Sequence, residues 1–251
     1  MRNVMPCVGL VVLGGCLTII VAPDEQPFFD SQPEPRAAFP TVVIDAGHGG
    51  RDGGARANGL VEKDLTVDVA IRTEKLLKQF GFQTVMTRRD DTYLTLPERA
   101  AIANGIENAI FVSIHFNHAS GGTGIETFYA SEKVPPENAW TWVGFFNKPK
   151  TAALDNGETL AGYIQASLVM RTEATNRGIR GRPLYVVRHT RCPAALVECG
   201  FISNAFEARL IANVPYRDKL ARAIAEGVMS YTKSRPRPPG SAPALAQAAT
   251  R

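Results

Sequence analysis

The strongest constraint on the fold is an alternation between residues 41 and 233, where short apolar runs take turns with segments whose apolar residues recur at helical spacing. Short apolar runs are typical of buried strands, and the longer periodic segments are typical of amphipathic helices. Strands that alternate with helices favour an α/β fold with a single, mostly parallel, twisted sheet and helices on both faces. The expected strands are 41–45, 82–87, 109–115, 124–130, 183–187 and 194–198, and the expected helices are 62–80, 96–103, 160–171 and 215–231.

A glycine-rich loop, residues 46–59, follows the first expected strand. Open α/β sheets bind their ligands at the carboxyl edge of the strands, so we expect the chemistry of this chain at that edge. The loop lacks the Gly-Lys-Ser/Thr ending of a phosphate-binding loop, which disfavours a nucleotide site there.

The composition and charge of the chain narrow the range of functions that it can have. The chain has 251 residues, of which 45% are hydrophobic and 21% charged, which suits one good-sized globular domain with modest terminal extensions. The net charge of +4 comes from scattered Lys and Arg residues. Without a basic stripe we expect no nucleic-acid partner, although a weakly basic surface suits an anionic polymer such as a cell wall.

The first 22 residues have the layout of an export signal, because Arg2 precedes a charge-free run over 4–22. Residues 23–40 are rich in proline and in acidic and polar side chains, and they are predicted to form a flexible tether. The folded domain is then expected over 41–233, and a disordered Pro- and Ala-rich tail over 234–251.

Three interpretations of the export signal stay open. Leu13-Gly14-Gly15-Cys16 is similar to the lipobox of bacterial lipoproteins, in which the cysteine is acylated and becomes the first mature residue. The apolar run continues past Cys16, which instead fits a plain cleaved signal or an uncleaved anchor. Either way we expect an exported domain in the periplasm or cell envelope, which meets a membrane only through this signal or a lipid anchor.

Four residues with catalytic chemistry are expected to meet at the carboxyl edge of the sheet. Of the four histidines, His48 and His115 stand at the ends of separate expected strands. Glu62 begins the first helix just beyond the glycine-rich loop, and Glu198 closes the strand 194–198. Two imidazoles, one carboxylate and an open fourth position make a recognised catalytic zinc site.

Zinc in such a site lowers the pKa of its water to about 7, and a carboxylate that is not a ligand can pass the proton of that water to the leaving amine. We assign the second role to Glu198, with one Zn²⁺ held by His48, Glu62 and His115. The competing interpretation treats the histidines as hydrogen-bonded strand-end residues and Glu62 as a carboxylate favoured by the helix dipole. This competing interpretation explains each residue separately, but it does not explain why all of them are expected at the same edge of the sheet.

Motifs around these residues run through the whole domain, from 42 to 231. In order they are Val43-Ile44-Asp45-Ala46-Gly47-His48-Gly49-Gly50, Asp52-Gly53-Gly54-Ala55, Glu62-Lys63-Asp64-Leu65, Thr87-Arg88, Arg99, Ala103-Asn104, Ser113-Ile114-His115-Phe116-Asn117, Gly124-Ile125-Glu126 and Pro193-Ala194-Ala195-Leu196-Val197-Glu198-Cys199-Gly200-Phe201-Ile202-Ser203-Asn204. This pattern closely resembles the zinc-dependent N-acetylmuramoyl-L-alanine amidases of bacterial cell-wall turnover.

The resemblance implies zinc ligands at His48, Glu62 and His115 and a catalytic glutamate at Glu198. It also implies the reaction, which is hydrolysis of the amide between the lactyl group of N-acetylmuramic acid and the L-alanine of the stem peptide. Peptidoglycan is then the expected partner, and cell-wall turnover or cell separation the expected process.

Other residues within or next to these motifs are assigned further roles. Asn117, His118 and Glu126 are the candidate substrate-binding residues. For Arg88 and Arg99 we favour a structural role over contact with stem-peptide carboxylates, because arginines at strand and helix ends often pair locally.

The segment 131–157 departs from some relatives, in which a longer regulatory helix blocks the zinc until an activator binds. Here the segment is short and carries Trp140 and Trp142, and we expect an inserted loop or short helix whose aromatics pack over the core. Autoinhibition and a protein activator are kept as hypotheses.

Two rival functions share the same residues. A zinc peptidase that cuts within the stem peptide would use identical metal chemistry. A non-catalytic wall-binding lipoprotein would keep the fold and would be indifferent to Glu198→Gln.

Overall fold

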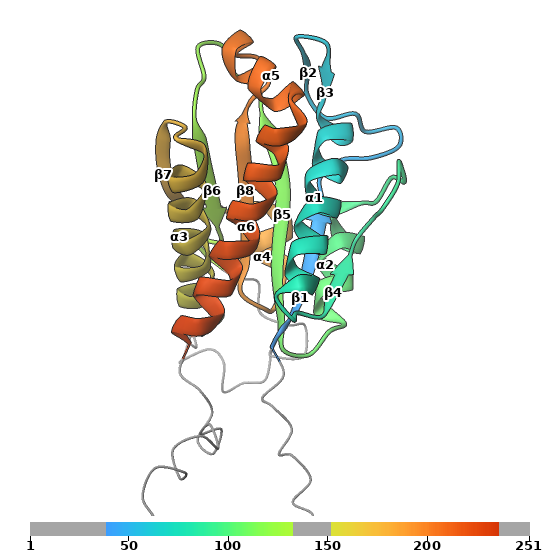
Figure 1. Cartoon of the computed structure of the whole chain (residues 1–251). Helices are drawn as coiled ribbons and strands as arrows, with labels where there is room; N and C mark the ends of the chain where they lie inside the picture. The colour runs from blue at the N-terminus through green and yellow to red at the C-terminus, as the bar shows by residue number, and fades with distance from the viewer. Residues whose placement is uncertain (1–38, 133–151, 236–251) are drawn as a thin grey trace, which may run out of the picture. The chain divides into compact units, whose positions relative to one another are not determined.

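The computed structural model describes residues 39–132 and 152–235. Its main sheet has six strands in the order β4-β1-β5-β8-β6-β7 (Figure 1). Strands β4, β1, β5 and β8 run parallel, β6 is antiparallel to β8, and β7 is parallel to β6. The strands are β1 (Thr41–Ala46), β4 (Thr84–Met86), β5 (Ala109–Asn117), β6 (Ile125–Tyr129), β7 (Asn176–Gly181) and β8 (Ala194–Phe201). The prediction of a mostly parallel sheet is confirmed.

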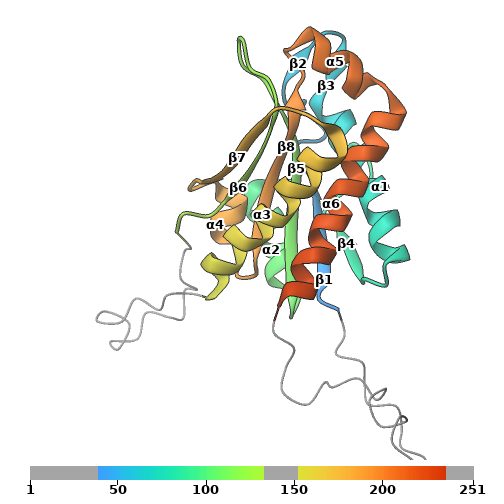
Figure 2. The same cartoon turned by 60° about the vertical axis from the view of Figure 1, so that its left-hand side comes forward.

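Helices cover both faces of this sheet, as expected (Figures 1 and 2). One face packs against α1 (Glu62–Gln79), α3 (Ala152–Thr172) and α6 (Val214–Ser234), which bury the larger apolar cluster with alternate residues of the central strands. The other face carries the shorter α2 (Leu96–Asn104) and α4 (Tyr185–His189) over a smaller cluster. Helix α2 begins with a capping box between Thr95 and Glu98, which agrees with the expected start.

The face of the sheet that carries the two short helices also carries side chains at the carboxyl ends of β5 and β8. Side chains alternate along a strand, so β5 places Ile110, Val112 and Ile114 in the larger cluster and turns Phe111 and His115 toward the face of α2 and α4. The same alternation turns Glu198 of β8 to that face. These strand ends lie on the same side of the molecule as α5 (Ala205–Ala212) and the hairpin of β2 (Arg56–Ala57) and β3 (Leu60–Val61) (Figure 1).

Five local features differ from the sequence predictions. The expected strand 183–187 is largely helix α4, because Val186 and Val187 are buried by one helical turn packed beside α2 rather than by a strand ladder. The edge strand β7 was not predicted, nor was α5 (Ala205–Ala212), which Asn204 caps. The glycine-rich loop contains a small hairpin of β2 (Arg56–Ala57) and β3 (Leu60–Val61), and α3 starts at Ala152 inside the expected insertion.

Several predictions fall on residues outside the described ranges. These are the export signal with Cys16, nearly all of the tether, residues 133–151 of the inserted segment and most of the tail. Across 39–132 and 152–235, no helix combines the length and apolar character needed to cross a membrane.

Candidate metal centre and active site

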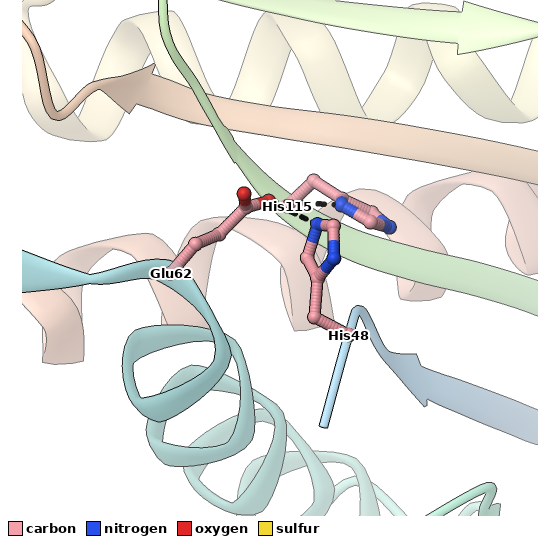
Figure 3. Close-up of side chains that lie close together, drawn as sticks. All are labelled: His48, Glu62 and His115. Atoms are coloured by element: carbon pink, nitrogen blue, oxygen red, sulfur yellow. Dashed lines mark hydrogen bonds and ion pairs between the residues drawn. The ribbon is translucent and has the colours of Figure 1, made fainter. Parts of the chain in front are cut away.

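His48, Glu62 and His115 converge at the carboxyl edge of the sheet, as predicted (Figure 3). His48 lies on the loop after β1, Glu62 is the first residue of α1, and His115 lies near the end of β5. The Nε2 atom of His48 and the Nδ1 atom of His115 are each 3.0 Å from Oε1 of Glu62. One ligand atom from each residue lies within 4.8 Å of the other two, which is compact enough for a single metal ion.

Glu62 is fixed as a buried carboxylate. Its Oε2 accepts a hydrogen bond from the amide of Ala55 at 2.9 Å, and Oε1 accepts one from the amide of Phe116 at 3.1 Å. Burial raises the pKa of Glu62, but hydrogen bonds from His115 and His48 outweigh it and hold the pKa well below its ordinary value. Glu62 therefore presents a charged oxygen to both imidazoles.

The ring of His48 is held in place through its other nitrogen, Nδ1. Nδ1 lies 2.9 Å from Oδ2 of Asp52, and the backbone of His48 adopts a left-handed φ of 60°, which is uncommon outside glycine. Burial lowers the pKa of His48, while Glu62 and then Asp52 raise it, and the net shift is upward. Carboxylates that hold the distal nitrogen of a ligand histidine are common in zinc sites.

Two buried arginines hold the loop that carries His48. Arg99 donates to the carbonyls of Ala46 and His48, both at 2.6 Å, and pairs with Asp45 at 2.7 Å. Arg88 donates to Ala46 at 2.9 Å and to Gly47 at 2.6 Å. The predicted structural role of both arginines agrees with these contacts, because they engage backbone carbonyls that parallel-strand pairing leaves unused.

Glycine is required where the loop passes the side chains of His48, Glu62 and His115. A Cβ atom on Gly54, which has φ of +63°, would lie 2.6 Å from Oε2 of Glu62 and 2.7 Å from the ring of His48. A Cβ atom on Gly47 would overlap the ring of His115. The backbone thus approaches the ligands as closely as glycine allows, which explains the composition of the loop.

The donor set fits a cation such as Zn²⁺. When Nδ1 of His48 donates to Asp52, Nε2 of the neutral ring is a lone pair that faces the carboxylate of Glu62. Two electron-rich atoms at 3.0 Å repel unless a proton or a metal ion lies between them. Nδ1 of His115 lies at the same distance from this carboxylate oxygen. Two imidazole nitrogens and one carboxylate oxygen are the ligands of known catalytic zinc sites.

Glu198 lies beside this centre on the neighbouring strand. It pairs in register with His115 of β5 on one side and Glu126 of β6 on the other, so the three side chains share one face of the sheet. Its Oε2 is buried and has no hydrogen-bond partner among the described residues. Burial, opposed by His115 and reinforced by Glu62 and Glu126, raises the pKa of Glu198 to about 7.

The three candidate substrate-binding residues are placed differently. Asn117 donates to Oε1 of the buried Glu126 at 3.2 Å, so both belong to the row of side chains next to Glu198. His118 is exposed and lies outside the metal cluster. Arg177 and Arg180 of β7, which the sequence did not single out, reach Oε2 of Glu126 at 3.4 and 3.5 Å.

A pocket of about 220 Å³ opens beside the two histidines. Asp45, Asp52 and Arg99 contribute its polar groups, and the rest of its wall is apolar or aromatic and comes from the segment before α2, from α4 and from β8. That wall consists of Tyr93, Leu94, Leu96, Leu184, Tyr185, Val186 and Leu196. Substrate groups that approach a metal at this centre would enter beside a largely apolar surface.

Comparison with known proteins agrees with this geometry. The family model described as N-acetylmuramoyl-L-alanine amidase matches residues 42–230. The chain is 37% identical over 192 residues to the uncharacterized protein YqiI of Bacillus subtilis, covering 76% of this chain and 84% of YqiI. It is 32% identical over 213 residues to the germination-specific N-acetylmuramoyl-L-alanine amidase of the same organism, covering 79% and 82% of the two chains.

A solved structure shows the same fold. The N-acetylmuramoyl-L-alanine amidase of Clostridium difficile 630 superposes with a TM-score of 0.67 at 36% identity, and the match covers 79% of this chain and 99% of the other. The predicted family and activity are therefore confirmed. The chain belongs to the N-acetylmuramoyl-L-alanine amidase family, whose activity is hydrolysis of the amide that joins N-acetylmuramic acid to L-alanine in peptidoglycan.

Proposed function

We propose that this amidase works with one Zn²⁺ held by His48, Glu62 and His115, and that Glu198 is its general base and acid. The observation that carries the proposal is the pair of imidazole nitrogens that face one buried carboxylate oxygen at 3.0 Å. A bound Zn²⁺ supplies Lewis acidity, which polarises an amide carbonyl and makes water more acidic.

Glu198 supplies the proton transfers. Its Oε2 has no hydrogen bond to any residue that the structure describes, so it is available to accept a proton from the attacking water. Burial raises the pKa of this carboxyl above its ordinary value, which makes it a stronger base for the proton of that water. Glu198 then delivers this proton to the nitrogen of the leaving L-alanine, and the amide C–N bond breaks.

The test combines metal analysis with a peptidoglycan digest by the purified chain. We expect about one equivalent of zinc and released peptides that begin with a free L-alanine amine, identified by mass spectrometry. Fragments cut within the stem peptide would instead support the peptidase alternative. A chain that holds no metal and releases nothing would contradict the proposal.

Asp52→Ala is expected to weaken zinc binding by about 10–100-fold, because outer carboxylates that orient a ligand histidine contribute about that much. The change removes the partner of Nδ1 of His48 and leaves all three ligands in place. Competition with a chelator measures the affinity, and excess zinc should restore much of the activity. Asp64→Ala, an exposed carboxylate in the first turn of α1, is the control. Equal affinities in the two variants would show that Asp52 does not orient His48.

The substrate places this amidase in the cell envelope. We propose export through residues 1–22, with acylation of Cys16 as the lipid anchor, on the basis of the charge-free run and the lipobox-like sequence. Incorporation of a labelled fatty acid that Cys16→Ala abolishes would support the anchor, and release of unlabelled protein from the cells would exclude it. A protein activator that acts through 131–157 stays a hypothesis, which deletion of 135–150 tests, since unchanged peptidoglycan release would remove its support.

A further inference from the structure

We infer that Arg180, held by Glu126 beside Glu198, binds a carboxylate of the stem peptide and makes the enzyme prefer free over amidated peptide acids. The inference rests on the proposed amidase mechanism, since it concerns the peptide that leaves when the amide is cut. It assigns substrate selectivity to the edge strand β7 (Asn176–Gly181).

A continuous row of polar side chains leads from the metal centre to β7. His115, Glu198 and Glu126 are in-register partners on three adjacent strands, so they lie on one face of the sheet. Oε2 of Glu126 is 3.5 Å from Nε of Arg180 and 3.4 Å from Nε of Arg177. The two arginines therefore extend the row by one more strand, on the side of Glu198 away from His115.

The two arginines differ in how their guanidinium groups are used. Arg177 also reaches the carbonyl of Thr123 at 3.4 Å and lies 5.1 Å from the ring centre of Phe201. Arg180 touches Glu126 only through Nε, and its side chain is 45% exposed. Within the described residues no hydrogen bond engages its two terminal nitrogens, which form the fork that binds a carboxylate bidentately.

The combined charge of Glu126, Arg177 and Arg180 also favours the binding of an anion. Glu126 is buried, with one oxygen bound to Asn117 and the other, Oε2, lacking any contact of hydrogen-bond geometry among the described residues. Two arginines and one carboxylate leave a local charge of 2 − 1 = +1. A single carboxylate on Arg180 would neutralise it, while Glu126 keeps the guanidinium from swinging into solvent.

The spacing selects which carboxylate can reach Arg180. Adjacent strands lie about 4.8 Å apart, so β7 is two steps, or about 10 Å, from Glu198 on β8. An extended peptide advances about 3.4 Å per residue. A peptide whose L-alanine amine lies at Glu198 would bring the carboxylate of its second or third residue to Arg180.

The experiment compares synthetic N-acetylmuramoyl tripeptides that differ only in whether the carboxyl groups of the second and third residues are free or amidated. The wild type should show kcat/KM about 10-fold or more higher for the free acid, mainly through a lower KM, because hydrogen bonds from a guanidinium to a carboxylate are stronger than those to a neutral amide. Arg180→Gln should lose this preference and cleave the amidated peptide as the wild type does. Arg180→Lys should keep part of it.

Arg182→Gln is the matched control, because Arg182 is exposed just beyond β7. Equal losses on both peptides in Arg180→Gln, or an unchanged preference for the acid, would overturn the inference. Equilibrium binding of both peptides to the Glu198→Gln protein separates this result from failure of the amidase mechanism. There the free acid should bind about 10-fold more tightly even without turnover, and equal affinities would reject the role of Arg180.

Discussion

Glu198→Gln is expected to lose about 10²–10⁴-fold in kcat while it still binds one equivalent of zinc, because it removes only the group that moves protons. Gln has nearly the same shape, and Glu198 is not among the three residues that form the metal cluster. Turnover of peptidoglycan and metal content are measured on the same preparation. Glu107→Gln, an exposed glutamate outside the site, should behave as the wild type.

Glu198→Gln should also change how the stability of the protein depends on pH. Burial raises the pKa of Glu198 from an ordinary 4.5 to about 7, so the folded chain retains a proton that the unfolded chain has lost. The metal-free wild type therefore loses stability as pH rises from about 4.5 to 7, by up to about 3 kcal/mol, and stays at that lower level above pH 7. Glu198→Gln removes this loss, so it should be the more stable protein at pH 8 and match the wild type near pH 4.

Urea unfolding of both proteins in the presence of a chelator checks this pH profile. A constant difference in the free energy of unfolding across the range would mean that the carboxyl does not titrate as its burial requires. A variant that keeps more than about a tenth of the wild-type kcat would remove Glu198 from the mechanism.

Glu62→Gln is expected to weaken zinc binding by well over 100-fold and to abolish activity at ordinary zinc concentrations. It removes the only negative charge among the three ligands, a larger change than the loss of an outer partner such as Asp52. In contrast to Asp52→Ala, excess zinc should restore little activity. Metal content by mass spectrometry and peptidoglycan release measure the two effects, and Asp64→Asn in the same helical turn is the control. A Glu62→Gln protein that keeps its zinc would refute the proposed ligand set.

The sequence was sufficient for the metal cluster because chain order and sheet geometry agree there. His48 and His115 come at the ends of strands that pair in parallel, and parallel strands end at one edge. Glu62 follows a short hairpin that returns the chain to that edge. Each of these positions follows from a local sequence pattern together with one general property of α/β sheets, which is that ligands bind at the carboxyl ends of the strands.

The features that could not be predicted from the sequence depend on contacts between segments that are far apart in the chain. Arg180 lies on an edge strand whose sequence, Asn-Arg-Gly-Ile-Arg-Gly, lacks apolar alternation and has Ile179 as its single β-branched residue. It is a strand because β6 offers hydrogen bonds on its outer side. Asp52 lies in a glycine-rich loop without periodicity, so its contact with His48 could not be anticipated. The apolar run before Arg188 was assigned to a strand because length and composition alone do not separate a short helix from a strand.

The two ends of the main sheet differ in how they resist unwanted pairing. Edge strands expose hydrogen-bonding groups that can recruit extended chains, and a cell-wall enzyme works among peptides that offer such chains. At one end β4 has only three residues, which limits the length of any added ladder. At the other end β7 carries two arginines and two glycines, whose charge and poor strand propensity oppose sheet extension. The composition that makes β7 hard to predict therefore also disfavours its pairing with another extended chain.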